Sequence, residues 1–219
     1  MKKESLKQML YEQVARIGKA LASPKRLELI ELLAQGEKSV DLLARQAGID
    51  MRLASAHLRV LREARLVETR RDGKFVHYRL SGRDVASFQV RMRELAEAHL
   101  AELGAAIGRM MAAPETLSPE DRESLLARAR RGEVIVIDVR PGDEYLAGHL
   151  PCARSMPLDE LQQRMAELPP GSQVVAYCRG PFCMMSDAAV GLLRRHGFAA
   201  HKMIDGIAEW RAHGLPVEC

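Results

Sequence analysis

Residues 51–80 read MRLASAHLRVLREARLVETRRDGKFVHYRL, and they decide the fold of the first half of this chain of 219 residues. Apolar residues recur at helical spacing over 51–64, which predicts a helix there. The buried side of that helix is predicted to consist of Leu53, Ala54, Leu58 and Leu61. The spacing then changes, and two β-prone runs flank the pair Asp72-Gly73. Such a pair is a strong hairpin signal, so the segment predicts a helix followed by a β-hairpin.

Further helices are predicted before residue 51. Apolar residues at helical spacing predict a helix over 7–22. Ser23-Pro24 supplies an N-cap and a proline at the first helical position, which predicts a second helix that Gly36 ends. Ser39 is the expected cap of a short helix over 40–46. The first half is therefore expected to be mainly helical.

Residues 83–112 return to a helical pattern and predict one long helix. Its apolar residues are too many for a helix that stays single in water, so we expect it to pack against a partner chain. Ser118-Pro119 begins a fresh helix. These patterns predict a first domain over 1–112, a linker over 113–117 and a second domain over 118–219.

The second half alternates strands with helices. Apolar runs predict strands over 134–138, 173–177 and 199–203, and helical spacing predicts helices over 158–167, 183–196 and 206–213. This alternation is typical of a parallel α/β sheet, whose ligands gather at the carboxyl ends of its strands. Asp138 and Cys178 both stand at such ends.

The charge is divided along the chain. Residues 1–112 carry 21 basic and 14 acidic side chains, whereas residues 113–219 carry 12 and 15. A basic first domain suits contacts with nucleic-acid phosphates, and it suits an ordinary solvated helical surface equally well. No run approaches the roughly 20 apolar residues of a membrane span, and the charged start lacks the apolar segment of a secretory signal. We expect a cytoplasmic protein without membrane contact.

All four cysteines lie in the second half, and none belongs to a Cys-x-x-Cys pair, so a stapling disulfide framework is not expected. Cys178 stands where the strand over 173–177 turns into a helix, and Cys183 follows in the stretch CRGPFC. The N-terminus of a helix favours a thiolate and any anion that it holds. A phosphatase would need an arginine at position 184 to grip an oxyanion, and this position is Met184.

The first half resembles the ArsR/SmtB family of bacterial repressors. The matching runs are SPKRLELIELL (23–33), ASAHLRVLREARLV (54–67) and RRDGKFVHYRL (70–80). The resemblance extends over about residues 5–100. It implies a winged helix-turn-helix, a homodimer, and double-stranded operator DNA as the partner.

The resemblance places a recognition helix at Met51–Arg62 in the major groove and a wing at Arg70–Lys74. The polar residues one turn apart on the outer face of the recognition helix are candidates for base or phosphate contacts. Each is as readily a solvated surface residue. The candidate DNA-binding residues are Arg52, Ser55, His57, Arg59, Arg70, Arg71 and Lys74.

Family members often sense metal ions, and this chain departs from their patterns. The helix that carries metal-binding cysteines in the family reads KSVDLL here (38–43), and His99 has no second histidine within one turn. We therefore expect no metal site in the first domain and no cofactor.

Residues 118–219 resemble a rhodanese domain. The matching motifs are IVIDVR (135–140), EYLAGHLPCA (144–153) and DGIAEW (205–210). The resemblance implies sulfane-sulfur transfer, in which the Cys178 thiolate takes sulfur from a donor such as thiosulfate, polysulfide or a persulfide and becomes a persulfide itself. Backbone N–H groups of residues 179–183 would cradle the outer sulfur.

Some residues around this loop carry open alternatives. Cys152 replaces the usual glycine, and we expect it to be a small buried hydrophobic residue. Cys183 either attacks a Cys178 persulfide or points its thiol into the core. Arg179 is expected to shape the anion pocket, and Asp138 and Arg140 are expected to pair and brace the loop.

The leading hypothesis is a dimeric repressor whose rhodanese domain senses or generates reactive sulfur and thereby changes operator affinity. One alternative is a sulfurtransferase whose winged helix serves dimerisation or recruitment. Another keeps DNA binding and makes the second domain an inert docking module. The sequence leaves open the sulfur donor and whether modification releases or tightens DNA binding.

Overall fold

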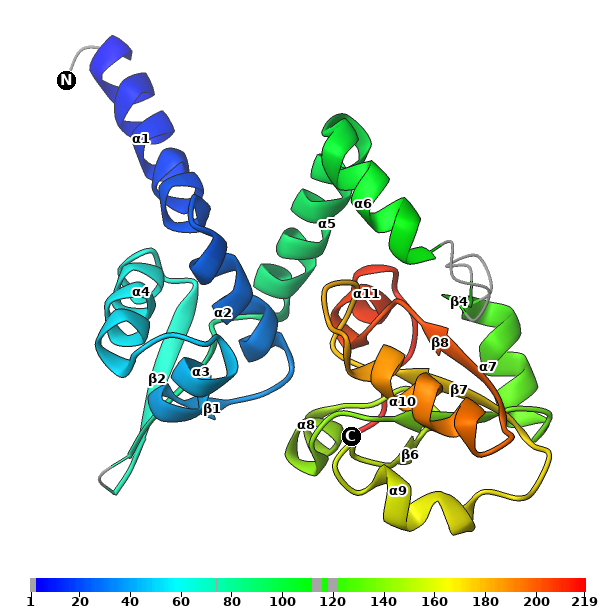
Figure 1. Ribbon diagram of the computed structural model, residues 1–219. Helices are drawn as coiled ribbons and strands as arrows, with labels where there is room; N and C mark the ends of the chain where they lie inside the picture. The colour runs from blue at the N-terminus through cyan, green and yellow to red at the C-terminus, as the bar shows by residue number, and fades with distance from the viewer. Residues whose placement is uncertain (1–2, 74, 112–115, 118–121) are drawn as a thin grey trace. The chain divides into compact units, whose positions relative to one another are not determined.

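The computed structural model describes residues 3–73, 75–111, 116–117 and 122–219 (Figure 1). The chain divides into two compact units, 1–89 and 90–219. The division falls inside the helix that follows the hairpin, whereas the predicted linker was 113–117. Residues 113–115 lie outside the described part of the chain, and residues 116–117 form a short strand.

The first unit consists of helices with a small antiparallel sheet (Figure 1). The sheet has the order β1-β3-β2, and the hairpin pairs Val67 with Leu80 at its base. This is a winged helix-turn-helix arrangement, as predicted. The elements are α1 (Lys3–Leu21), α2 (Pro24–Ala34), β1 (Lys38–Ser39), α3 (Val40–Gln46), α4 (Met51–Glu63), β2 (Val67–Asp72) and β3 (Phe75–Leu80).

Side-chain caps begin two of these helices. The Ser39 hydroxyl accepts a hydrogen bond from the N–H of Leu42, which begins α3 as predicted. The Asp50 carboxylate accepts from the N–H of Leu53, which begins α4. The Ser23 side chain makes no such bond. Pro24 stands at the first helical position of α2, where its fixed φ suits the helix and its missing N–H leaves no donor unpaired. Each cap satisfies a backbone donor that the first turn leaves unpaired.

The core of the first unit confirms most of the predicted buried side of α4. Ala54, Leu58 and Leu61 are fully buried. Leu53 was wrongly predicted to join them, because its side chain is 41% exposed. It precedes Ala54 by one residue, which turns it about 100° around the helix and away from the core.

The predicted single helix over 83–112 is wrong. The chain forms two helices, α5 (Arg83–His99) and α6 (Ala101–Met111), which meet at a corner at Leu100 (Figure 1). At this corner a Cβ on Gly104 would lie only 3.1 Å from the carbonyl oxygen of Glu97. The absent side chain of Gly104 therefore allows α6 to approach the end of α5 closely.

The second unit contains a parallel sheet of order β4-β8-β7-β5-β6. The predicted strands over 173–177 and 199–203 are confirmed to the residue. Its strands are β4 (Thr116–Leu117), β5 (Ile135–Asp138), β6 (Arg154–Ser155), β7 (Gln173–Tyr177) and β8 (Ala199–Met203). Its further helices are α7 (Arg122–Arg130), α8 (Gly142–Ala147), α9 (Leu161–Arg164), the 3-10 turn η2 (Met165–Glu167), α10 (Met185–Arg195) and α11 (Ile207–Ala212).

Several elements of the second unit differ from their predicted bounds. The helix expected over 158–167 is a short helix followed by a 3-10 turn. The predicted helix start at Ser118-Pro119 lies outside the described residues, and the described helix begins at Arg122. Strands β4 and β6 have two residues each, which is too short for a hydrophobic pattern.

Successive side chains of a strand point to opposite faces of the sheet. In the second unit, each of the two faces packs into a hydrophobic core. Val174 and Ala176 of β7 pack in one core with residues of α9 and α10. Val175 and Tyr177 pack in the other core, with Leu125 of α7 and Trp210 of α11. Burial on both faces explains why β7 reads as a continuous apolar run.

We predict that Leu58→Ala destabilises the winged-helix unit by about 2–5 kcal/mol, because it leaves a cavity in a closed core. Leu53→Ala on the same helix is the matched control and should change the free energy of unfolding by less than about 0.5 kcal/mol. Urea denaturation followed by circular dichroism measures both. Equal losses for the two variants would contradict the burial described for α4.

Candidate functional site

The thiol loop, residues 178–184, leaves the sheet at the carboxyl end of β7 and leads into α10. Asp138 ends the neighbouring strand β5 and pairs in register with Tyr177. The two predicted strand ends therefore lie side by side. The loop contains both cysteines that the sequence singled out.

Cys178 is buried at the base of the loop, with 1% of its surface exposed. Its sulfur lies 3.3 Å from the hydroxyl oxygen of Ser186 and 3.3 Å from the carbonyl oxygen of Cys183. When the thiol donates its proton to the Cys183 carbonyl, the Ser186 hydroxyl is able to donate to the sulfur. Ser186, which is also buried, was not predicted as a site residue, since no motif marked it.

The two thiols interact, and they differ in acidity. The hydrogen bond with Cys178 lowers the pKa of Cys183 to about 6, with help from the backbone N–H groups of Met185 and Arg179. The same contact with Cys183, together with burial, raises the pKa of Cys178. In the reduced pair the proton therefore stays on Cys178 and the charge lies on Cys183. The rhodanese resemblance implies a reactive thiolate on Cys178, and Cys183 lies closer to the start of α10.

Arg179 follows Cys178, and its guanidinium forms a bidentate ion pair with Glu144. The two nitrogen–oxygen distances are 2.7 and 3.0 Å, and the Glu144 side chain is fully buried. This pair fastens the loop to α8. Sequence reasoning missed Glu144 as a site residue, although it opens the EYLAGHLPCA motif.

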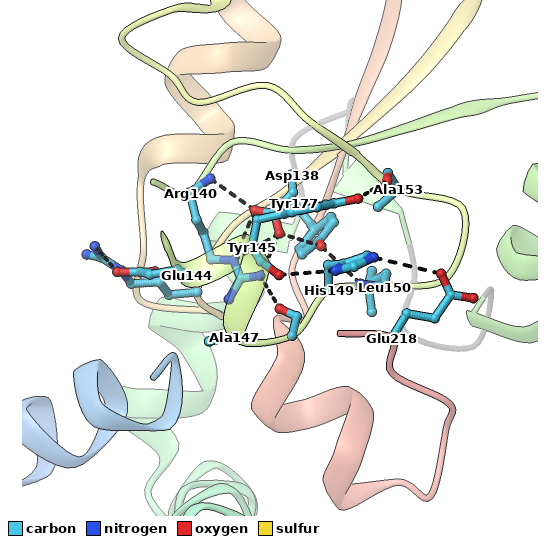
Figure 2. A network of polar contacts seen from close by, with 12 residues as sticks. Asp138, Arg140, Glu144, Tyr145, Ala147, His149, Leu150, Ala153, Tyr177 and Glu218 are labelled. Carbon is cyan, nitrogen blue, oxygen red and sulfur yellow. Dashed lines mark hydrogen bonds and ion pairs between the residues drawn. The ribbon is translucent and has the colours of Figure 1, made fainter. Parts of the chain in front are cut away.

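Asp138 and Arg140 form the predicted pair, and both side chains are fully excluded from solvent (Figure 2). The Nε of Arg140 lies 2.9 Å from a carboxylate oxygen of Asp138. The Tyr177 hydroxyl donates to Asp138 over 2.5 Å and accepts from the N–H of Leu150. Arg140 also donates to the carbonyl of Gly148 over 2.7 Å. The network joins the ends of β5 and β7 to the segment over 148–150.

Tyr145 and His149 lie beside these residues (Figure 2). Their rings stack with centroids 3.8 Å apart, and the Tyr145 hydroxyl donates to the carbonyl of Ala153. His149 also lies 3.8 Å from the carboxylate of Glu218. These contacts join residues of the 144–153 segment to one another and to Glu218.

Cys152 was wrongly predicted to be a small buried residue, because its side chain is exposed. Its φ of 65° lies in the left-handed region that favours glycine. This backbone conformation explains why glycine is usual at the position in the resembling family. Cys152 therefore occupies a turn and belongs to neither core.

The candidate DNA-binding residues lie mostly on exposed parts of the first unit. Arg52, Ser55 and Arg59 are exposed on α4, one turn apart, and His57 is half-buried. Arg71 is exposed on β2. These polar candidates on α4 therefore lie at the surface of the first unit.

Arg70, on the wing, forms ion pairs with two acidic neighbours. Its guanidinium lies 2.6 Å from the Glu37 carboxylate and 3.4 Å from that of Asp72. The hydrogen bond from Arg70 lowers the pKa of Glu37. Lys74, the remaining candidate, lies outside the described residues.

Within the described residues, no group of three or more histidine, cysteine, aspartate or glutamate side chains is arranged to hold a metal ion. In the same part of the chain, no helix has the length and apolar character needed to cross a membrane.

Comparisons with known proteins match both halves. Residues 23–69 match the family described as "Bacterial regulatory protein, arsR family", and residues 121–213 match the "Rhodanese-like domain". A solved structure, the homodimeric winged helix-turn-helix DNA-binding domain of Mb0332 from Mycobacterium bovis, is 41% identical. The match covers 46% of this chain and 90% of the Mb0332 domain, with a TM-score of 0.41.

Two curated proteins are similar to this chain over different lengths. A sulfurtransferase of Allochromatium vinosum is 34% identical over 99 residues, which are 44% of this chain and 91% of that protein. The HTH-type transcriptional regulator Rv0324 of Mycobacterium tuberculosis is 43% identical over 212 residues, which are 97% of this chain and 93% of that protein. Since this second likeness spans nearly the whole of both proteins, the chain belongs to the ArsR family of bacterial transcriptional regulators, in a form that carries a rhodanese-like domain after its winged helix-turn-helix.

Proposed function

We propose that this ArsR-type regulator is a homodimeric repressor that senses reactive sulfur through a persulfide on Cys178. The observation that carries the proposal is the thiol pair. A buried protonated thiol and a thiol with a pKa of about 6 contact each other in a loop of a chain that also holds a winged helix. The Ser186 hydroxyl is placed to stabilise negative charge on the Cys178 sulfur.

The first chemical step joins the donor sulfur to Cys178. The Cys183 thiolate accepts the Cys178 proton, and the Cys178 thiolate attacks a sulfane sulfur of a polysulfide. A new sulfur–sulfur bond forms on Cys178 as a bond of the polysulfide breaks, and the shortened polysulfide leaves with the electron pair. With thiosulfate as donor, sulfite leaves instead.

The second step uses Cys183 as the resolving thiol. Cys183 loses its proton and attacks the Cys178 sulfur, which expels hydrosulfide and leaves a Cys178–Cys183 disulfide. Both cysteines are oxidised, and the donated sulfur is reduced to hydrosulfide. Either the persulfide or the disulfide changes the conformation of the thiol loop. A coupling free energy of about 1–3 kcal/mol between this change and DNA binding would change operator affinity roughly 5- to 150-fold.

The DNA contacts are assigned to the exposed basic face of α4 and to the wing. Dimerisation is supported by large apolar side chains left exposed along α1. Leu10, Tyr11 and Val14 are 57%, 67% and 72% exposed, which is costly for an unpartnered helix. A second copy of the chain would cover this face.

A second candidate function is sulfur transfer with turnover, favoured by the similarity to the Allochromatium vinosum sulfurtransferase. In that case Cys178 would pass its sulfur to a thiol acceptor, and the winged helix would serve recruitment. Turnover of thiosulfate that Cys183→Ser leaves undiminished would favour this function over sensing.

We predict that Cys178→Ser abolishes the change in operator affinity that polysulfide causes in the wild type, because it removes the sulfur acceptor. Operator affinity before treatment should stay within about twofold, since Cys178 belongs to the second unit. Fluorescence anisotropy at fixed salt measures both values. Cys152→Ser, at an exposed cysteine outside the loop, is the matched control. A full response from Cys178→Ser would refute the proposed role.

The pKa of the thiol pair generates a prediction on reactivity. Because the pKa of Cys183 is lowered to about 6, its thiolate predominates at pH 7 and is lost as the pH falls below 6. Iodoacetamide should therefore label Cys183 near its maximal rate at pH 7, whereas Cys178, which must first pass its proton to Cys183, should react more slowly. Mass spectrometry of the peptide over 178–183 measures each site. Preferred labelling of Cys178 at pH 7 would reverse the assignment.

We predict that Arg59→Ala weakens operator binding by about 1–3 kcal/mol if Arg59 contacts a base. If Arg59 contacts a phosphate, binding to all sequences should weaken, and the dependence of log K on log salt should fall by about 0.9. Anisotropy titrations over a salt series distinguish the two cases. Arg154→Ala, at an exposed arginine of the second unit, is the control for lost charge. Unchanged affinity and salt slope for Arg59→Ala would remove Arg59 from the interface.

A further inference from the structure

The start of α11 lies directly against the backbone of the thiol loop. A Cβ on Gly206 would come within 2.2 Å of the Arg179 carbonyl oxygen and 2.8 Å of the Cys178 carbonyl oxygen. Gly180 in the loop, at φ 148°, faces both carboxylate oxygens of Glu209, which would lie 3.1 and 3.2 Å from a Cβ there. A displacement of the loop backbone must therefore displace Gly206 or Glu209.

Glu209 is a buried charge whose position depends on a few contacts. Its side chain is 5% exposed, and one carboxylate oxygen accepts from the N–H of Gly206 over 2.8 Å. The other oxygen lies 2.7 Å from the guanidinium of Arg93. Burial raises the pKa of Glu209, and the charge of Arg93 opposes that shift. Arg93 is therefore the counter-charge that a buried carboxylate requires.

Arg93 also contacts the loop by a second route. Its guanidinium carbon lies 6.0 Å from the centroid of the Phe182 ring, next to Cys183 in the chain. Formation of a Cys178–Cys183 disulfide would constrain the residues between the two cysteines, including Gly180 and Phe182. Both of these residues face the Arg93–Glu209 pair.

Helix α5, which carries Arg93, is fastened to α11 by flanking residues. Arg91 donates to the carbonyl of Ala212 over 2.9 Å, and the Glu94 carboxylate lies 3.0 Å from the His213 ring. The helix runs without a break from Arg83 to His99. Its residues before Val90 belong to the first compact unit, and those from Val90 onward belong to the second. A continuous helix transmits a shift at one end to the other.

We infer that the Arg93–Glu209 ion pair is the positioning element that conveys the sulfur state of the Cys178–Cys183 loop to α5 and so to operator affinity. The inference rests on the proposed sensing function. Arg93 and Glu209 touch neither sulfur, and they act through Gly180 and Phe182. Because such coupling is reciprocal, operator DNA changes the equilibrium between reduced and modified loop by the same factor.

The test compares the full-length dimer of the wild type with Arg93→Met, which keeps side-chain length and removes the charge. Operator affinity is measured before and after polysulfide treatment, and mass spectrometry counts the sulfur added to the peptide over 178–183. In the wild type we expect a change between 5- and 150-fold. In Arg93→Met we expect a ratio near 1 although the loop is modified to the wild-type extent. Arg93→Lys should restore part of the ratio, since it restores the charge.

Two further variants separate coupling from structure. Arg131→Met removes an exposed ion pair with Glu133 that involves neither α5 nor α11, so it should respond like the wild type. Glu209→Gln keeps the shape of the side chain and removes the need for a counter-charge, so it should stay folded and lose most of the response. Thermal melts of every variant establish that the second unit is folded.

The outcomes are distinguishable. A wild type that is modified at Cys178 without any change in operator affinity refutes the sensing function, and the inference falls with it. A wild type that responds, together with Arg93→Met and Glu209→Gln variants that respond equally, overturns the inference alone. A wild-type response that both variants lose, while their loops are modified normally, supports it.

Discussion

The buried ion pair between Asp138 and Arg140 is the interaction on which the thiol edge of the second unit depends. Both side chains are fully excluded from solvent, so removing one partner would leave an uncompensated charge at a cost of about 3–5 kcal/mol. Tyr177 and the carbonyl of Gly148 complete the hydrogen bonds of the pair. Because Tyr177 ends β7 and Cys178 follows it, the pair fixes the point at which the thiol loop leaves the sheet.

The elements that the sequence predicted well are those whose pattern is local. The strand over 173–177 was predicted to the residue because it is a continuous apolar run between polar residues. The break at Leu100 was missed, since periodicity continues through it and its cause is the close approach of Gly104 to the carbonyl of Glu97. Leu53 was misplaced for a similar reason: an apolar residue beside a buried face extends the pattern without entering the core.

The candidate site was predictable where its contacts join residues that are close together in the sequence. Asp138 and Arg140 stand two residues apart on one strand end, and their pairing was predicted. The partner of Arg179 is Glu144, far away in the chain, and only the folded sheet brings the two together. The contact between the two thiols lowers the pKa of Cys183 and, with burial, raises that of Cys178. This difference depends on the folded loop and does not follow from residue spacing.

Among the described residues of the second unit, four carboxylates are buried, and each pairs with an arginine. The arginine partners of Asp138, Glu144 and Asp205 lie within the rhodanese-like segment, whereas the partner of Glu209 lies on α5. An unpaired buried carboxylate would either cost several kcal/mol or take up a proton, so the second unit is electrostatically incomplete without the later half of α5. The compact unit that contains these carboxylates begins at Val90, within α5, and therefore includes Arg93. Helix α5 therefore supplies, through Arg93, the counter-charge of a carboxylate that lies against the backbone of the thiol loop.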